Sequence, residues 1–230
     1  MSTVLIVSEL KNGQIRKSAF EAVTVGRRLA DSRGARVAVL HMAAAAGQEG
    51  SFAAYGADQL YTVIDPVCEN YQADLYKRIV VEAIQKSGAT LILFAASNMG
   101  RDLAPRVAAV LQGTCVSDVT AVAAEGDDLV AEKPMYAGKI LAHLKVSGAV
   151  KVVTLRPGVF PAQECRAGAT LSAESLPCPA VDSAVKLVEV RKSGSGRLNV
   201  SDADIIVTGG RGMRAAEHFA LLDELAQLLG

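Results

Sequence analysis

The stretch Thr90-Leu91-Ile92-Leu93-Phe94-Ala95, which is followed by Ser97, Asn98 and a helical segment at about 100–111, decides the fold. Its residues are nearly all apolar and show no polar alternation, which is typical of a strand buried on both faces. Ser97 and Asn98 are good helix caps, so a helix is expected to begin directly after the strand. A buried strand that leads through a short turn into a helix is the repeating unit of a parallel α/β sheet.

The same alternation extends toward the N-terminus. Branched apolar runs predict strands, and apolar residues at helical spacing predict helices between them. An Ala/Gly-rich stretch with a short helix separates two of the strands. We therefore predict a mostly parallel sheet with helices on both faces, with strands at 3–8, 36–42, 60–65 and 90–95 and helices at 18–33, 71–87 and 100–111.

Beyond Gly113 the character of the sequence changes to short β-like segments joined by tight turns. Gly126-Asp127-Asp128 and Ser147-Gly148 have the residue types that tight turns require. We expect an antiparallel extension of the parallel sheet, then a loop at 157–179 and one more strand at 184–190. The predicted segments of the extension are 119–124, 129–134, 139–146 and 150–156.

The polar stretch Arg191-Lys192-Ser193-Gly194-Ser195-Gly196-Arg197 has the composition of a flexible linker. We predict an N-terminal α/β domain at 1–192, a linker at 193–203 and the start of a second α/β domain at 204–230. In this second domain a strand at 204–208 precedes an amphipathic helix at 214–229. One strand and one helix cannot build a core, so the second domain is expected to be incomplete.

Composition excludes several classes of function. The chain of 230 residues has 24 Lys+Arg and 24 Asp+Glu, which argues against a protein built for non-specific nucleic-acid binding. No apolar run is long enough to span a bilayer, and the N-terminus resembles neither a signal nor a transit peptide. A soluble intracellular protein is expected, with reduced cysteines and no metal site. A nucleophile–base pair of Cys115 and His143 is not supported by any spacing, and we expect no catalytic residue.

The turn Gly209-Gly210-Arg211-Gly212 is the sharpest candidate binding site. Glycines allow a ligand to approach the backbone, and a following helix N-terminus favours anions. Arg211 adds a permanent planar cation, and the turn follows a predicted strand, where α/β sheets bind ligands. A plain strand–helix connection with a solvated arginine explains the same pattern equally well.

The segment Ser97-Asn98-Met99-Gly100-Arg101-Asp102-Leu103-Ala104-Pro105-Arg106 is the second candidate, also at a strand end and a helix start. Helix capping with a solvated Arg101/Asp102 face is favoured over ligand binding here, and a surface that contacts another protein domain stays open. The first strand–helix turn, 8–18, has no glycine-rich nucleotide motif.

Three segments together resemble one known family. Ile205-Ile206-Val207-Thr208-Gly209-Gly210-Arg211-Gly212-Met213 resembles the opening of the FAD domain of electron-transfer flavoprotein alpha subunits. Gly100–Val119 and Pro134–Lys139 resemble the same family, in the same order and at matching spacing. The resemblance covers nearly the whole chain.

This resemblance implies an electron carrier and not an enzyme. Its first domain would be an adenine-nucleotide hydrolase-like α/β fold without a cofactor, paired with a beta subunit that carries AMP. Gly209, Gly210, Arg211 and Gly212 would contact FAD, and the Arg211 cation would favour the reduced, negatively charged flavin. Because the other FAD motifs of the family are missing after Gly230, the chain is expected to be an incomplete form that binds FAD poorly or not at all.

The resemblance also implies the redox partners. Electrons would come from acyl-CoA and related dehydrogenases of fatty acid beta-oxidation and pass to a membrane quinone oxidoreductase, in the bacterial cytoplasm or, in a eukaryote, the mitochondrial matrix. A nitrogen-fixation-linked or flavin-bifurcating branch is the alternative within the family. The alternative outside it is a nucleotide-binding α/β module that acts as a regulator or an assembly scaffold.

Overall fold

The computed structural model describes residues 2–166, 168–183, 185–190, 203 and 205–229. The chain divides into two units, Met1–Lys186 and Leu187–Gly230. Apart from Ala203, the predicted linker at 193–203 lies outside the described residues, and the predicted boundary after residue 192 stays a prediction.

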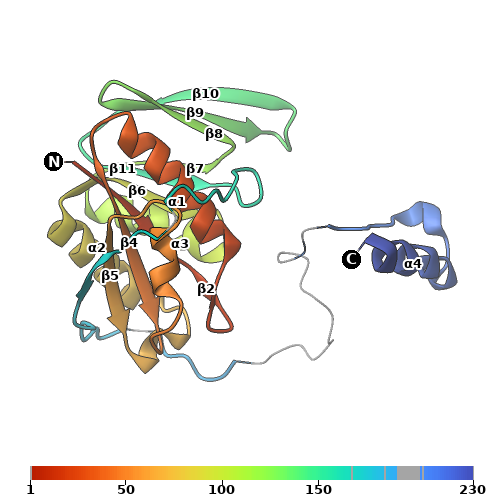
Figure 1. The fold of residues 1–230 in the computed structure, drawn as a ribbon. Coiled ribbons are helices and arrows are strands. Elements are labelled where there is room, and N and C mark those ends of the chain that lie inside the picture. Colours follow the sequence, from red (N-terminus) through yellow and green to blue (C-terminus); the bar gives the residue numbers. More distant parts are fainter. Residues whose placement is uncertain (1, 167, 184, 191–202, 204, 230) are drawn as a thin grey trace. The chain divides into compact units, whose positions relative to one another are not determined.

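The first unit is built on one seven-stranded parallel sheet (Figure 1). Its strands are β1 Thr3–Val7, β4 Arg36–Ala43, β5 Gln59–Ile64, β6 Ala89–Ala95, β7 Thr114–Val119, β11 Lys151–Leu155 and β12 Ser172–Ser175. They lie in the order β12-β5-β4-β1-β6-β11-β7, and every neighbouring pair is parallel. The predicted mostly parallel sheet is confirmed.

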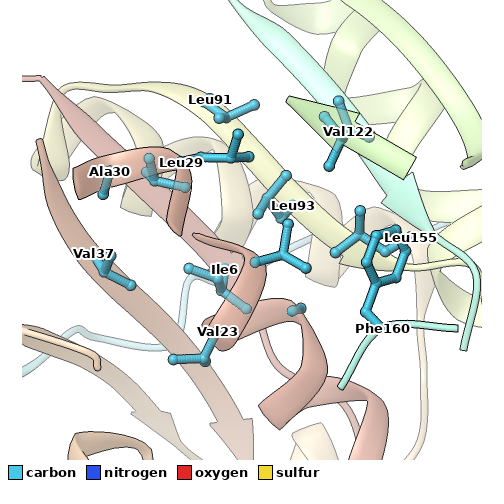
Figure 2. Packing of buried hydrophobic residues seen from close by; sticks show 14 of the residues in the cluster. Ile6, Val23, Leu29, Ala30, Val37, Leu91, Leu93, Val122, Leu155 and Phe160 are labelled. Carbon is cyan, nitrogen blue, oxygen red and sulfur yellow. The ribbon is translucent and has the colours of Figure 1, made fainter. Parts of the chain in front are cut away.

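Helices cover both faces of this sheet, as predicted. α1 (Lys17–Asp31) packs on one face, where Val23 and Leu29 share a core with Ile6 and Leu93 (Figure 2). α2 (Ala73–Ser87) and α3 (Asn98–Val110) pack on the other face, in a second core. Alternate residues of β1 enter the two cores, because neighbouring side chains of a strand point to opposite faces. Burying each large apolar side chain contributes about 1.5–3 kcal/mol.

The turn from β6 into α3 depends on a glycine. Ser97 accepts a hydrogen bond from the amide of Gly100 at 3.1 Å and caps the helix. A Cβ on Gly100 would lie 1.9 Å from the carbonyl oxygen of Ala95. Only a residue without a side chain lets the first turn of α3 approach the end of β6 so closely.

The predicted antiparallel region forms a sheet of its own rather than extra strands of the main one. It consists of β8 (Ala121–Glu125), β9 (Asp128–Met135) and β10 (Ile140–Val146), in the order β10-β9-β8. It lies beside α1 (Figure 1), and Val122 contributes to the same core as Leu155 and Phe160 (Figure 2). The side chain of Arg28 ties α1 to this sheet by donating to the carbonyl of Val122 at 3.0 Å.

Two of the predicted strands in this region were wrong in extent or partner. The strand predicted at 119–124 is interrupted at Thr120. Val119 is the last residue of β7, and the residues from Ala121 onward belong to β8. Asp118 has a φ of 60° just before the break, so the chain turns out of the main sheet there. The segment predicted at 150–156 is β11, which lies parallel between β6 and β7 rather than in the antiparallel sheet. All five residues of β11 are buried, as expected for a strand covered on both faces.

The strands β2, β3 and β12 were not predicted, nor was β7 apart from its last residue. β2 (Leu10–Lys11) and β3 (Gln14–Ile15) form a hairpin in the first strand–helix turn. Asn12 and Gly13 both have positive φ there, 51° and 75°, the Asn-Gly pattern of a tight hairpin turn. β12 lies within the predicted loop 157–179 and pairs with β5 at the sheet edge. Its polar sequence Ser-Ala-Glu-Ser lacks the apolar pattern that identifies a strand.

Three further predictions, all for residues from 184 onward, were wrong. No described residue of the strands predicted at 184–190 and 204–208 is in a strand. Apolar residues there are exposed, and a strand needs a neighbour to pair with. The helix predicted at 214–229 is shorter: α4 (Ala220–Leu229) follows two single turns, η4 (Arg211–Met213) and η5 (Ala216–Phe219). Between these turns Arg214 has a φ of 62°, which interrupts a continuous helix.

Candidate functional site

The turn Gly209–Gly212 lies at the start of the second unit's helical part. All four of its residues are exposed. The carbonyl of Gly210 accepts a hydrogen bond from the amide of Met213 at 3.0 Å, and that of Arg211 accepts from Arg214 at 3.2 Å. These bonds hold η4 as a tight turn, so the guanidinium of Arg211 extends from an ordered backbone.

Gly209 packs closely within this unit. A Cβ on Gly209 would lie 2.6 Å from Cδ1 of Leu222 and 2.8 Å from Cγ of Met213. The glycine therefore lets the extended segment before the turn lie directly against the first turns of α4. Leu222 is half-buried for the same reason, whereas Leu221, Leu225 and the rest of α4 are exposed.

The backbone geometry of the turn suits an anionic or planar ligand only in part. It presents a permanent cation and three glycines whose backbone a ligand can approach. Arg211 and Gly212 are themselves part of the single 3-10 turn η4 and do not lead directly into a helix. Such a short turn is a weaker anion site than the predicted helix N-terminus. These residues can thus supply one side of a flavin site, and the role assigned to them from sequence stays a prediction.

The second candidate segment makes mainly internal contacts. Ser97 caps α3, and Asp102 accepts a hydrogen bond from Nε of Arg106 at 2.9 Å and another from the Tyr71 hydroxyl at 2.6 Å. The Tyr71 hydroxyl and the nearby Arg106 hold the pKa of Asp102 below its usual range. This arrangement agrees with the capping and surface-pairing interpretation that was favoured for 97–106.

Arg101 of this segment belongs to a charged cluster at the end of the sheet. Its Nη2 lies 3.7 Å from Oδ1 of Asp118. Arg156 pairs with the same carboxylate, with its Nη2 2.8 Å from Oδ2. Nearby, Lys133 donates to the Ser117 hydroxyl at 3.0 Å. The hydrogen bonds from Arg156 lower the pKa of Asp118. Three cations around one carboxylate make a basic, partly exposed surface, which suits contact with an acidic partner better than a buried ligand.

Sequence reasoning did not find this cluster. Asp118 and Arg156 are 38 residues apart and no motif links them. They meet because β7 and β11 are neighbours, and that pairing was not predicted.

The other candidate residues lie in separate elements. Cys115 is in β7, and His143 is in β10 with its Nδ1 3.5 Å from Oε1 of Glu132. All four cysteines are free thiols. Among the residues that the structure describes, no three His, Cys, Asp or Glu side chains are grouped to hold a metal ion, and no helix is both long and apolar enough to cross a bilayer.

Comparison with known proteins gives a consistent result. Residues 4–181 match the family model described as the electron transfer flavoprotein domain. The electron transfer flavoprotein subunit alpha of Bacillus subtilis is 32% identical over 228 residues, which are 99% of this chain and 70% of the relative. The chain belongs to the electron transfer flavoprotein alpha-subunit family. The sequence-based resemblance to that family is confirmed.

Further members of the family align over the same extent. The subunit alpha of Syntrophomonas wolfei is 34% identical over 235 residues, all of this chain and 72% of the relative. The Protein FixB of Clostridium saccharobutylicum is 31% identical over 232 residues, 99% of this chain and 69% of the relative. These alignments include the second unit, so the likeness extends beyond the α/β domain that the family model covers.

Proposed function

We propose that this chain acts as the alpha subunit of a heterodimeric electron carrier that uses FAD. The observation that carries the proposal is the alignment of alpha subunits over both units, 99–100% of the chain. The parallel α/β domain fits a role in binding the partner subunit. Its charged cluster around Asp118 and its β2–β3 hairpin lie at the surface and do not line an enclosed catalytic pocket. The beta subunit is the assembly partner and carries AMP.

FAD supplies the electron-carrying chemistry when it is bound. Toward that group this chain contributes the backbone of Gly209–Gly212 and the charge of Arg211. The glycines keep side chains away from the ligand, and the packing of Gly209 under Leu222 orients the turn. Arg211 stabilises negative charge on its ligand, because a guanidinium is a permanent, planar cation.

The donors and acceptors follow from the same proposal. Acyl-CoA and related dehydrogenases of fatty acid beta-oxidation deliver electrons, and a membrane quinone oxidoreductase accepts them, in a bacterial cytoplasm. The identities to alpha subunits, 27–34%, overlap with those to FixB proteins, 28–31%. Identity alone therefore does not choose between the ordinary and the nitrogen-fixation-linked or bifurcating branches.

The alternative of a nucleotide-binding regulator or scaffold has less support. A nucleotide phosphate needs backbone amides of a glycine-rich loop or a cation near the strand ends. The first strand–helix turn instead forms the β2–β3 hairpin, and the crevice beside it is lined by Glu9 and Glu69.

The test is to isolate the protein with its partner from the native source. We expect a yellow complex with a cognate beta subunit, about one FAD per heterodimer, and bleaching of the flavin by an acyl-CoA dehydrogenase with its substrate. A colourless native complex, or one whose flavin no dehydrogenase reduces, would refute the carrier function.

A further inference from the structure

The edge strand β12 ends beside the carboxyl end of β5. The two strands are parallel, with Ser175 opposite Thr62, and the amide of Leu176 donates to the carbonyl of Thr62 at 2.8 Å. Cys178 follows Ser175 at the same spacing as Asp65 follows Thr62. The register of the two strands therefore brings Cys178 close to Asp65.

Cys68 reaches the same place from the other side. The 3-10 turn η2 (Pro66–Glu69) begins directly after Asp65, and the amide of Cys68 donates to the Asp65 carbonyl at 2.9 Å. The Cys68 side chain belongs to the core on the α2 and α3 face, and Cys178 packs against that core. Both residues are free thiols, and their side chains share a hydrogen bond. Two sulfur atoms from distant parts of the sequence thus lie next to each other.

Their surroundings give the two thiols different roles. Cys68 is only 4% exposed, whereas Cys178 is partly exposed. Burial raises the pKa of both thiols, and their shared hydrogen bond raises the pKa of Cys68 further but lowers that of Cys178. Because the thiolate is the reactive form, Cys178 is the thiol that a small oxidant reaches and the better nucleophile of the two. Cys68 can react only with a group that is already beside it.

We propose that Cys68 and Cys178 form a redox modification site, at which hydrogen peroxide converts the two thiols into one disulfide. Sγ of Cys178 attacks one peroxide oxygen, the O–O bond breaks, one water leaves and a sulfenic acid remains. Sγ of Cys68 then attacks Sγ of Cys178; the S–S bond forms, the S–O bond breaks and a second water leaves. Two electrons pass from the sulfur atoms to the peroxide, and both thiol protons end in the released water. The proposal is independent of the flavin-dependent function.

The disulfide would fasten a weakly held edge of the sheet. β12 is short and polar, and it lies at the end of the strand order beside β5. The ion pair between Lys86 and Glu174, at 2.8 Å, is exposed and adds little. A covalent bond from Cys178 to the η2 turn would fix the chain directly after β12. It would thereby hold the segment that continues toward the second unit, which begins at Leu187.

The experiment is oxidation of the folded full chain with hydrogen peroxide at low micromolar protein concentration. Remaining thiols are blocked with N-ethylmaleimide, and a tryptic digest is analysed by mass spectrometry without reduction. We expect one dominant linked pair, the peptides 37–77 and 167–186, which contain Cys68 and Cys178. Dithiothreitol should separate the two peptides. The proposal is overturned if another pair dominates, or if these peptides stay unlinked, whether Cys178 remains a thiol or becomes a sulfinic acid.

Hydrogen exchange and thermal unfolding measure the effect of the link on β12. Oxidation should slow exchange of the Ser172 and Leu176 amides, which donate to β5 and the residue before it, by about tenfold. It should also raise the melting temperature by about 5 °C. A linked chain with unchanged exchange at these amides would refute the role in holding β12.

Two variants separate this pair from the other thiols. Cys178→Ala, at a partly exposed position, should show neither the slower exchange nor the higher melting temperature after the same treatment. Cys165→Ala is the matched control, because Cys165 is an exposed thiol; this variant should form the link and show both effects. Circular dichroism confirms native folding of each variant. Equal responses of Cys178→Ala and wild type, or loss of the link in Cys165→Ala, would contradict a direct reaction between Cys68 and Cys178.

Discussion

Arg156 holds Asp118 through two parallel hydrogen bonds, from Nε to Oδ1 at 3.0 Å and from Nη2 to Oδ2 at 2.8 Å. The amide of Asp118 also donates to the Thr154 hydroxyl at 2.8 Å. Together these contacts fix the residue with a φ of 60°, at which the chain leaves the main sheet for the antiparallel one. The ion pair therefore stabilises the connection between the two sheets.

Asp118→Asn should destabilise the domain by about 1–2 kcal/mol at pH 7, since an Arg–carboxylate pair that is partly exposed is screened by water. Asparagine tolerates the positive φ, so this variant removes mainly the charge. The folded-state pKa of Asp118 is lowered by Arg156. Its stabilisation is thus present above the unfolded pKa of about 3.9 and disappears as the pH falls through the lower folded pKa. Urea unfolding should show the deficit at pH 7 and a much smaller one at pH 3; equal deficits would contradict this account.

Gly100→Ala should destabilise the domain strongly, by about 3 kcal/mol, because the new methyl group collides with backbone rather than with a flexible side chain. Gly50→Ala is the matched control: nothing lies within 4 Å of a Cβ there. Thermal and urea unfolding of both variants measure the difference. A Gly100→Ala protein as stable as Gly50→Ala would mean that the turn from β6 into α3 is not as tight as described.

The fold of the first unit is readable from sequence where elements are long and apolar. β6 and α3 were predicted within two residues at each end, because an uninterrupted apolar run and a Ser cap leave few alternatives. The position of β11 in the sequence was predicted correctly, but its neighbours in the sheet were not. The residues of a strand do not indicate which strands lie beside it. β12 was missed because its stability comes from pairing with β5 and not from apolar residues.

The candidate sites show the same limit. The Gly209–Gly212 turn is visible in sequence because three of its four residues are glycine, yet no described residue of the strand predicted before it is in a strand. The Asp118–Arg156 pair and the thiols of Cys68 and Cys178 bring together residues from distant elements, so only the topology reveals them.

The four thiols should differ widely in reactivity. Burial first, and the nearby Cys178, raise the pKa of Cys68 to about 12, whereas Cys165 is exposed. Because the thiolate is the reactive form, iodoacetamide at pH 8 should modify Cys165 first and Cys68 last. Peptide mass spectrometry over time gives the order, and Cys165→Ser should remove the fast phase. Rapid labelling of Cys68 in the folded chain would show that its surroundings are more open than described.

Arg211→Ala should lower the reduction potential of FAD in the native heterodimer. The proposed contact stabilises added negative charge, and a charge-assisted contact of about 1.5–3 kcal/mol corresponds to a shift on the order of 60–130 mV for one electron. Arg211→Lys should recover only part of this, because an ammonium does not reproduce the planar fork. Potentiometric titration measures the shift. If Arg211→Ala changes the reduction potential of FAD by less than about 15 mV, the arginine does not influence the flavin.

The most direct test of the central claim, that this chain is an alpha subunit, is the mass of its complex with the cognate beta subunit. Size-exclusion chromatography with light scattering at micromolar concentration should show one species whose mass is that of the partner plus 24.0 kDa, a 1:1 heterodimer. Two separate peaks at the masses of the individual chains would contradict the account.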